Sequence, residues 1–162
     1  MWPLESECTA FYGDPRGRNG HADPKWEAAN LVQIRAPYPM TYAGKPVTLI
    51  RIHRLCAGAL RAALADAWAR VGADLNKATA LGMTTYDGSY NYRLKRTNSE
   101  LSMHAFGCAL DFDAAHNPLG RRTGRFTEDH PLVLAFKAQG ATWGGNFRST
   151  PDLQHFQFAR VR

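Results

Sequence analysis

Apolar residues recur at helical spacing over residues 54–71 and lie three or four positions apart, on one face of a helix. They are Leu55, Ala59, Leu60, Ala63, Leu64, Ala67, Trp68 and Val71. Gly72 follows the last of them, and glycine is favoured just after a helix end. The pattern predicts the longest helix of the chain, with one face packed against a sheet. We interpret His53 and Cys56, near its start, as packing or surface residues.

Four shorter stretches have the alternation or the composition of β-strands. They are residues 47–52, 82–88, 109–113 and 155–158, and the second ends in an Asp-Gly turn. Residues 131–140 begin with proline and end with glycine, which is typical of a short helix. Together these elements predict an α+β fold in which a small antiparallel sheet is backed by helices.

The first part of the chain lacks such periodicity. Residues 12–20 in particular combine glycine, proline, aspartate and asparagine, which favour turns. We therefore expect an irregular N-terminal arm over residues 1–39 and a folded core over residues 40–162. Because a chain of 162 residues has the size of one domain, arm and core are expected to form a single domain over residues 1–162.

Composition excludes several classes of protein. Hydrophobic residues make up 44% of the chain and charged residues 21%, as in ordinary globular proteins, so a wholly disordered or fibrous protein is excluded. No apolar run approaches the roughly 20 residues that span a bilayer. The first residues lack the basic and apolar regions of a secretory signal. We expect no transmembrane segment, and synthesis in the cytoplasm without a signal peptide.

Charge and cysteine content narrow the choice of partner and compartment. Twenty Lys and Arg against 14 Asp and Glu give a net charge of +6, which favours an anionic partner such as nucleic acid, a lipid surface or a cell-wall polymer. The basic residues form no single block, so we predict no nucleic-acid binding. Three cysteines without a Cys-x-x-Cys pair do not resemble a disulfide framework, which favours synthesis in a reducing compartment.

The stretch of residues 102–113 carries the candidate chemistry. Imidazole and carboxylate groups are common zinc ligands, and a catalytic zinc site uses three protein ligands and leaves a fourth position open. His104 and Asp111 are too far apart for one helical turn, but a turn followed by a strand could direct both side chains to one point, with Gly107 permitting the bend. His155 is the best candidate for the third ligand.

The order of these residues resembles a known family. Ser-x-His-x-x-Gly-x-Ala-x-Asp over residues 102–111, then Trp-Gly-Gly at 143–145, then Asp-x-x-His-Phe at 152–156, is similar to the M15 family of zinc D-Ala-D-Ala carboxypeptidases and L-alanyl-D-glutamate endopeptidases. The resemblance extends from about Met40 to the C-terminus, so it implies that residues 40–162 are a catalytic core. It also implies a Hedgehog/D-Ala-D-Ala peptidase-like fold with a single zinc site and a bound Zn2+.

The resemblance assigns roles around the metal. Asp152, three positions before His155, corresponds to the acid/base residue of the family, which is Glu in some branches and Asp in others. An aspartate there is similar to the branch of phage endolysin-like endopeptidases. It would take a proton from the attacking water and pass it to the leaving amine. We expect Asp113 to support the metal ligands from behind or to end the strand.

Other residues are expected to contact the substrate. Residues 90–93, Tyr-Asn-Tyr-Arg, are similar to a family element whose arginine faces the metal. Arg93 is therefore the predicted cation that binds substrate and stabilises the oxyanion, with Arg96 as the alternative. Ser102 and Trp143 are predicted to contribute to substrate binding.

The implied function is zinc-dependent hydrolysis of the stem peptide of bacterial peptidoglycan, at the L-Ala–D-Glu bond. A D-Ala-D-Ala carboxypeptidase is the close alternative, because the same chemistry serves both bonds. A non-catalytic, zinc-stabilised wall-binding module is the alternative from another class, and Asp152 argues against it because a binding module needs no base beside the metal. We expect a monomer that acts on the cell wall after a separate system releases it.

Overall fold

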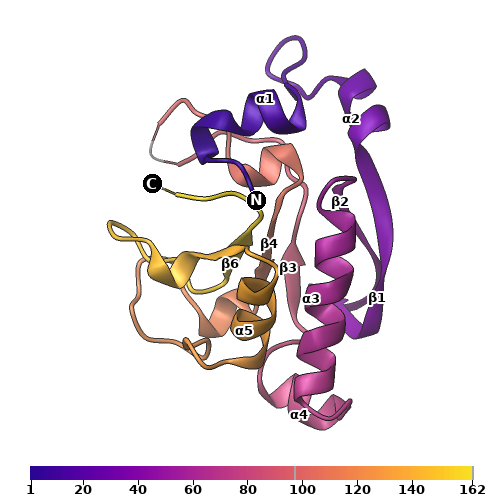
Figure 1. The fold of residues 1–162 in the computed structure, drawn as a ribbon, viewed down its shortest axis with the longest axis vertical. Coiled ribbons are helices and arrows are strands. Elements are labelled where there is room, and N and C mark those ends of the chain that lie inside the picture. The colour runs from indigo at the N-terminus through magenta and orange to yellow at the C-terminus, as the bar shows by residue number, and fades with distance from the viewer. Residues whose placement is uncertain (97, 162) are drawn as a thin grey trace.

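The computed structural model describes residues 1–96 and 98–161, and Figure 1 shows a mixed fold of helices and two small antiparallel sheets. One sheet pairs β1 (Leu31–Tyr42) with β2 (Lys45–His53). The other has the order β3-β4-β6-β5, with β3 (Tyr86–Gly88), β4 (Ala109–Phe112), β6 (His155–Gln157) and β5 (Thr142–Trp143). The α-helices are α1 (Cys8–Tyr12), α2 (Pro24–Asn30), α3 (Ala57–Arg70), α4 (Leu75–Ala80) and α5 (Pro131–Ala138). Small antiparallel sheets combined with helices are what the sequence predicted.

The predicted long helix is present as α3. Four of its five buried positions, Leu60, Ala63, Leu64 and Ala67, are among those that the periodicity selected, and the fifth is Ala57. The chain leaves the helix through Gly72, whose φ of 69° lies in the left-handed region that glycine adopts without a steric penalty. The helix contacts α5 and β1, so it lies between the two-stranded sheet and the rest of the molecule (Figure 1).

Aromatic side chains hold the four-stranded sheet against α5. Phe112 of β4, Phe156 of β6 and Phe136 of α5 are fully buried, and the ring centroids of Phe136 and Phe156 are 4.6 Å apart. Successive side chains of a strand point to opposite faces. Because Phe112 and Phe156 occupy the face toward α5, Asp111 and His155 point to the other face, where the candidate ligands converge.

The prediction of an irregular arm over residues 1–39 is wrong in part. This segment contains α1, α2 and most of β1. Pro37 and Pro39 obscured the strand pattern, because proline cannot donate to a β-ladder. The structure accommodates them where the pairing of β1 with β2 shifts register, between Arg35 and Met40.

The strand predicted over residues 82–88 is shorter than expected. Only Tyr86–Gly88 forms β3, and residues 82–84 make a turn. Gly82 has a φ of 76°, which a regular strand does not contain. The predicted strands at 47–52 and 109–113 and the helix at 131–140 are present as β2, β4 and α5.

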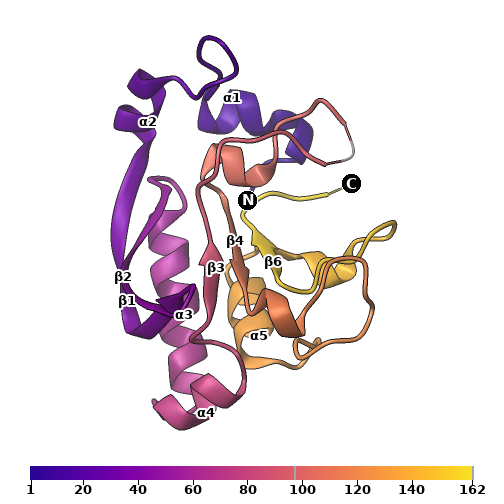
Figure 2. The ribbon, with the colours of Figure 1, turned by 180° about the vertical axis from the view of Figure 1, so that it is seen from behind.

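The last segment of the described chain passes beside the N-terminus, as Figure 2 shows, and Arg160 pairs with Leu4. The Glu5 amide donates to the Arg160 carbonyl at 3.0 Å, and the Arg160 amide donates to the Pro3 carbonyl at 2.7 Å. All three cysteines are free and buried, in keeping with the absence of a disulfide framework. No helix among residues 1–96 and 98–161 is long and apolar enough to cross a membrane.

Candidate metal centre

Asp111 and His155 are brought together by strand pairing. They are direct partners in the antiparallel ladder between β4 and β6, so their side chains leave the same face of the sheet as neighbours. His155 Nδ1 lies 2.9 Å from Asp111 Oδ1. Two of the three predicted ligands are therefore placed by the register of a sheet, which holds side chains more accurately than a loop does.

His104 reaches the same point from a 3₁₀ turn, η2 (Met103–Phe106). Its Nε2 atom lies 3.2 Å from His155 Nδ1 and 3.3 Å from Asp111 Oδ2. The turn ends at Gly107, which has a φ of 64°. A Cβ atom at Gly107 would lie 2.7 Å from the side chain of Leu31, so this position requires glycine for both conformation and space, as predicted.

The hydrogen bond of His104 fixes which ring nitrogen carries its proton. His104 Nδ1 lies 2.7 Å from the carbonyl oxygen of Ser89. A carbonyl can only accept, so Nδ1 must carry the hydrogen of the neutral ring. Nε2 then has a free lone pair, directed toward Asp111 and His155.

A second set of hydrogen bonds fixes His155 in the opposite tautomer. His155 Nε2 lies 3.0 Å from Gln157 Oε1. The Gln157 amide nitrogen donates to Glu5 Oε1 at 2.8 Å and to the Ala159 carbonyl at 3.2 Å, so the oxygen is the atom that faces His155. Nε2 therefore donates, and Nδ1 is the nitrogen that can bind a metal ion. Each imidazole is thus anchored through one nitrogen, and a metal ion would take the place of any hydrogen that the other nitrogen shares with Asp111.

This donor set fits zinc. The ligand atoms of His104, Asp111 and His155 all lie within 4.8 Å of one another. Ligand atoms bound at 2.0–2.1 Å to a tetrahedral zinc lie about 3.3 Å apart, and the three contacts described above measure 2.9 to 3.3 Å. Two imidazole nitrogens and one carboxylate are also the ligand types found in catalytic zinc sites.

The electrostatics of the cluster favour a cation. Burial opposes ionisation of Asp111, but the neighbouring His104 and His155 rings outweigh burial and hold its pKa well below the usual range. Burial acts to lower the pKa of His155, but the Asp111 carboxylate raises it overall. Both shifts show that the anionic carboxylate stabilises positive charge at the point where the three side chains meet.

Asp152 lies beside the ligands without being one of them. Its backbone carbonyl accepts from the His155 amide at 3.1 Å, and its amide donates to the Gly144 carbonyl at 2.9 Å. Burial raises the pKa of its carboxyl group above the usual value, and the Asp111 charge adds to the effect. Oδ1 is buried and has no hydrogen-bond partner among the described residues. A buried carboxylate oxygen without a partner is available to a reacting molecule.

Gly144 permits the approach of the loop that carries Asp152. A Cβ atom at Gly144 would lie 2.4 Å from the Asp152 carbonyl oxygen, closer than atoms can pack. The group that approaches Gly144 is therefore the backbone of the chain itself. The Trp-Gly-Gly segment forms the end of β5 and a 3₁₀ turn, η4 (Gly144–Asn146).

The two candidate arginines lie on the segment that precedes His104. The Arg93 carbonyl accepts from the Ser102 amide at 3.0 Å, which holds residue 93 alongside the turn of His104. Within residues 1–96 and 98–161, no hydrogen bond or ion pair engages the Arg93 guanidinium. The charge of Arg96 acts on Asp152 and works to lower its pKa. Arg96 thus acts on Asp152, the acid/base candidate, through its charge. Arg93 is held beside the His104 turn by a backbone hydrogen bond.

Ser102 and Trp143 have structural contacts. The buried Ser102 hydroxyl accepts from the His104 amide at 3.4 Å and caps the 3₁₀ turn. Trp143 is only 4% exposed, and its indole N–H donates to the Leu153 carbonyl at 2.7 Å. Both side chains therefore support residues of the site, and their predicted contact with substrate stays a prediction.

Asp113 does not support the ligands as expected. Its buried carboxylate contacts His116 Nδ1 at 2.7 Å and Arg125 at 2.8 Å. The Asp113 side chain points away from the ligands because its backbone φ of 49° breaks the alternation of the strand. The strand β4 therefore ends at Phe112, one residue before the predicted end. The groups that hold the ligand histidines are the Ser89 carbonyl and the Gln157 amide. Sequence reasoning missed both.

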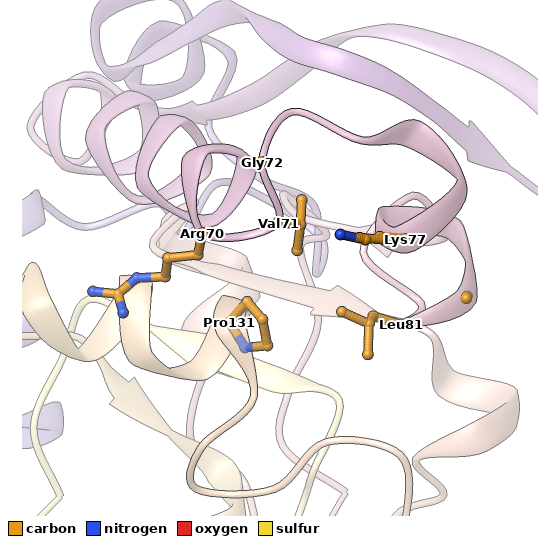
Figure 3. Close-up of a pocket in the computed structure, with 7 residues that line it drawn as sticks. Arg70, Val71, Gly72, Lys77, Leu81 and Pro131 are labelled. Atoms are coloured by element: carbon orange, nitrogen blue, oxygen red, sulfur yellow. The ribbon is translucent and has the colours of Figure 1, made fainter.

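A cavity of about 470 Å³ lies elsewhere, between the end of α3, α4 and the start of α5 (Figure 3). Val71, Leu81 and Pro131 give it an apolar lining, and Arg70 and Lys77 stand at its edge. It contains none of the candidate ligands, so we assign it no part in the chemistry.

Comparison with known proteins agrees with this geometry. Residues 95–158 match the model of an M15 peptidase family described as D-alanyl-D-alanine carboxypeptidase. Residues 95–158 are an M15 peptidase segment. The M15 segment contains the three candidate ligands, Asp152 and Arg96, whereas Arg93 lies just before it. No curated protein and no solved structure matches the chain.

The match confirms the resemblance that the motif indicated. M15 peptidases are zinc metallopeptidases, and the match of residues 95–158 supports a peptidase that acts on peptidoglycan. The His104, Asp111 and His155 cluster supplies the ligands that such a metal would require.

Proposed function

We propose that the protein is a zinc-dependent peptidase that hydrolyses the stem peptide of bacterial peptidoglycan at the L-Ala–D-Glu bond. One observation carries the proposal. Two imidazole nitrogens and the Asp111 carboxylate converge within an M15 segment, beside Asp152, a carboxylate whose buried oxygen has no partner in the described chain. We include in the proposal a single Hedgehog/D-Ala-D-Ala peptidase-like domain and a monomeric enzyme.

In this mechanism His104, Asp111 and His155 hold a zinc ion. When bound there, zinc supplies a Lewis acid that polarises the scissile carbonyl and makes water more acidic. Asp152 accepts a proton from the attacking water and later donates it to the leaving amine. Its half-buried environment suits this role, because burial raises the pKa of a carboxyl group and makes it a better base.

An arginine completes the proposed site. Arg93 is the proposed cation that binds substrate and stabilises the negative charge that develops on the carbonyl oxygen. Its support is the backbone hydrogen bond from Ser102, which holds residue 93 beside the His104 turn. Arg96 is the alternative, supported by its electrostatic effect on Asp152.

A D-Ala-D-Ala carboxypeptidase is the second candidate, and the description of the matching family favours it. The ligands and acid/base residue are the same for both bonds, so the difference depends on how the substrate is held. A non-catalytic wall-binding module is less well supported, because it would have no use for the free carboxylate oxygen of Asp152. The net charge of +6 suits the anionic polymers of a bacterial wall in each case.

Mass spectrometry of purified muropeptides digested with the protein tests the proposal. We expect products with a new free amino group on D-Glu, while L-Ala remains attached to the muramic acid. Release of free D-alanine from pentapeptide stems would favour the second candidate. Wall binding without any cleavage by the zinc-loaded protein would favour the binding module. Asp152→Asn is the control, because cleavage that depends on this site should fall sharply in that variant.

A further inference from the structure

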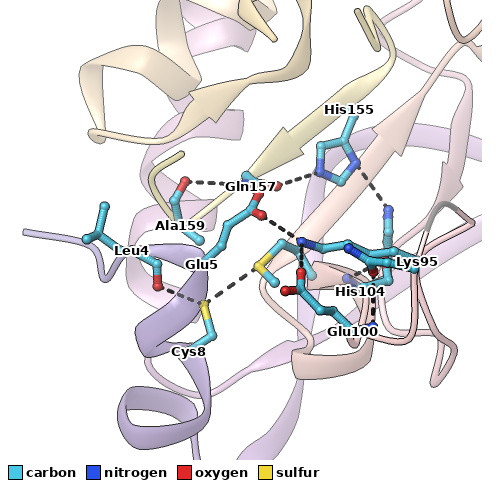
Figure 4. A network of polar contacts seen from close by, with 12 residues as sticks. Leu4, Glu5, Cys8, Lys95, Glu100, His104, His155, Gln157 and Ala159 are labelled. Carbon is cyan, nitrogen blue, oxygen red and sulfur yellow. Dashed lines mark hydrogen bonds and ion pairs between the residues drawn. The ribbon is translucent and has the colours of Figure 1, made fainter. Parts of the chain in front are cut away.

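A chain of hydrogen bonds runs from the candidate metal centre to the N-terminal segment (Figure 4). His155 Nε2 contacts Gln157 Oε1 at 3.0 Å, and Gln157 Nε2 contacts Glu5 Oε1 at 2.8 Å. Lys95 Nζ contacts the other Glu5 oxygen, Oε2, at 2.8 Å and Glu100 Oε2 at 2.9 Å. Glu5 lies outside the M15 segment of residues 95–158, yet two hydrogen bonds connect it to a candidate ligand.

The Gln157 amide is held in one orientation. Its NH₂ group faces two acceptors, the Glu5 carboxylate and the Ala159 carbonyl at 3.2 Å. Rotating the amide by half a turn would place its oxygen against both acceptors and would leave His155 facing an N–H group. Gln157 is only 1% exposed, so such mismatched pairs would lack water to compensate them. The oxygen therefore stays on the His155 side.

Glu5 is itself fixed from two directions. Its backbone amide donates to the Arg160 carbonyl at 3.0 Å, and its carboxylate forms an ion pair with Lys95. The two side chains of this pair are about three-quarters buried, at 24% and 25% exposure. Burial acts to lower the pKa of Lys95, but Glu5 and Glu100 raise it overall, so the lysine is held in its charged form.

We propose that Gln157 and Glu5 are positioning residues for the metal. Glu5 orients the Gln157 amide, the amide oxygen accepts the hydrogen on His155 Nε2, and the ring is thereby turned so that Nδ1 faces the point where a metal ion would meet His104 and Asp111. Groups that orient a metal-binding histidine typically contribute about 10- to 100-fold to metal affinity. The inference rests on the zinc site of the proposed function and adds residues that the M15 match alone does not assign.

The test removes each hydrogen bond without removing bulk. Gln157→Met keeps the length of the side chain but loses the acceptor for His155. Glu5→Met loses the acceptor for the Gln157 amide. Matched controls are Gln154→Met, whose amide donates only to the Asn117 carbonyl at 3.3 Å, and Glu7→Met, whose carboxylate accepts from the Leu4 amide at 2.8 Å. Neither control residue contacts His155 through its side chain in the described hydrogen bonds.

Two measurements report how these substitutions change the His155 ring and the affinity for zinc. Nitrogen-15 NMR of histidine-labelled, zinc-loaded protein reports which ring nitrogen carries the hydrogen and which one binds the metal. Competition with a chelator reports the Kd for Zn2+. In the wild type we expect hydrogen on Nε2 of His155 and on Nδ1 of His104. In Gln157→Met we expect a mixture of His155 tautomers and a Kd about 10- to 100-fold weaker.

A double variant separates positioning from packing. Combining Gln157→Glu with Glu5→Gln restores an acceptor for His155 Nε2 and reverses the polarity of the contact between positions 5 and 157. We expect it to recover the single His155 tautomer and part of the zinc affinity that Gln157→Met loses, because one carboxylate oxygen at position 157 then faces the Ala159 carbonyl without a hydrogen between them. A purely structural role for Gln157 predicts no such recovery, because the exchange disturbs the Lys95 ion pair and improves no packing.

The outcomes distinguish this inference from the proposed function. A wild-type protein that binds no zinc would overturn the metal site itself. Zinc binding through Nε2 of His155, with the hydrogen on Nδ1, would overturn the positioning role alone, and this result needs no variant to fold. An unchanged tautomer and a Kd within about twofold of wild type in Gln157→Met and Glu5→Met would also overturn it, since a positioning partner contributes at least about tenfold.

Discussion

Asp111 and His155 face each other across neighbouring antiparallel strands, with 2.9 Å between Asp111 Oδ1 and His155 Nδ1. The strands that carry them are held from behind by buried phenylalanine rings, including Phe112 and Phe156, whose centroids are 6.0 Å apart. Two ligands of the candidate centre are thus built into the sheet, and His104 joins them from a turn. Loss of any one ligand leaves the others correctly placed but an incomplete coordination shell.

We therefore predict that His104→Ala, Asp111→Ala and His155→Ala each fold but bind zinc much more weakly. Proteins hold zinc with four protein ligands in structural sites and with three in catalytic sites, so two protein ligands are too few for either. Elemental analysis after dialysis measures the zinc content. His116→Ala is the control, because the His116 side chain is 56% exposed and contacts Asp113 instead of the centre. Full zinc occupancy in all three ligand variants would contradict the assignment.

The role of Asp152 gives the second prediction. Asp152→Asn keeps the size of the side chain but cannot accept a proton, so hydrolysis of stem peptide should fall by about 10² to 10⁴, the usual contribution of positioned proton transfer. Zinc content and wall binding should stay near the wild-type level, because the three ligands are untouched. The rate and the zinc content are measured on the same preparation. Loss of zinc as complete as in His155→Ala would make Asp152 a ligand instead of the acid/base residue.

Parts of the fold and site were predictable because local sequence determines them. The helical spacing before Gly72 gave α3, and the alternation around Asp111 gave β4. The motif selected His104, Asp111 and His155 as candidate ligands, and the structure places their ligand atoms within 4.8 Å of one another. Here the chemistry of the residue types and their order carried the information.

Other parts depend on contacts that a sequence does not display. The Ser89 carbonyl that orients His104 has no sequence signal, because every residue has a carbonyl. Glu5 reaches the site from 152 positions before Gln157 in the chain, through the pairing of the first and last described residues. The direction of Asp113 depends on its left-handed backbone, with a φ of 49°. Long-range pairing and single dihedral angles are the features that periodicity cannot predict.

The third prediction concerns the arginine that faces the substrate. Arg93→Lys keeps the charge but loses the planar fork of the guanidinium, which is not a conservative change where two oxygens are held. We expect kcat/KM to fall while zinc stays bound, and Arg93→Ala to lose more. Arg96→Ala is made in parallel, because its charge acts on Asp152. Wild-type kinetics in Arg93→Ala combined with a defect in Arg96→Ala would move the role to Arg96.

The last prediction concerns acid sensitivity that arises away from the metal centre, at His53. This side chain is fully buried, and burial lowers its pKa from 6.5 to about 4. Its Nε2–H donates to the Tyr12 carbonyl at 3.1 Å, and its Nδ1 accepts from the Leu55 amide at 3.2 Å. Protonation would place a second hydrogen on Nδ1, against the N–H group that it now accepts from.

The sign follows from proton binding. Between pH 6.5 and about 4 the unfolded chain binds a proton at residue 53 that the folded protein does not bind, so the free energy of unfolding falls as the pH falls through this window. One such group contributes a slope of up to about 1.4 kcal/mol per pH unit. His53→Gln keeps a donor for the Tyr12 carbonyl but cannot titrate. Urea unfolding of both metal-free proteins across this window measures the free energy of unfolding as a function of pH. The slope of this curve should be smaller for His53→Gln, by an amount that corresponds to at most one bound proton. This holds even if the variant is less stable at neutral pH. Parallel curves for the two proteins would mean that His53 is not a source of the acid sensitivity.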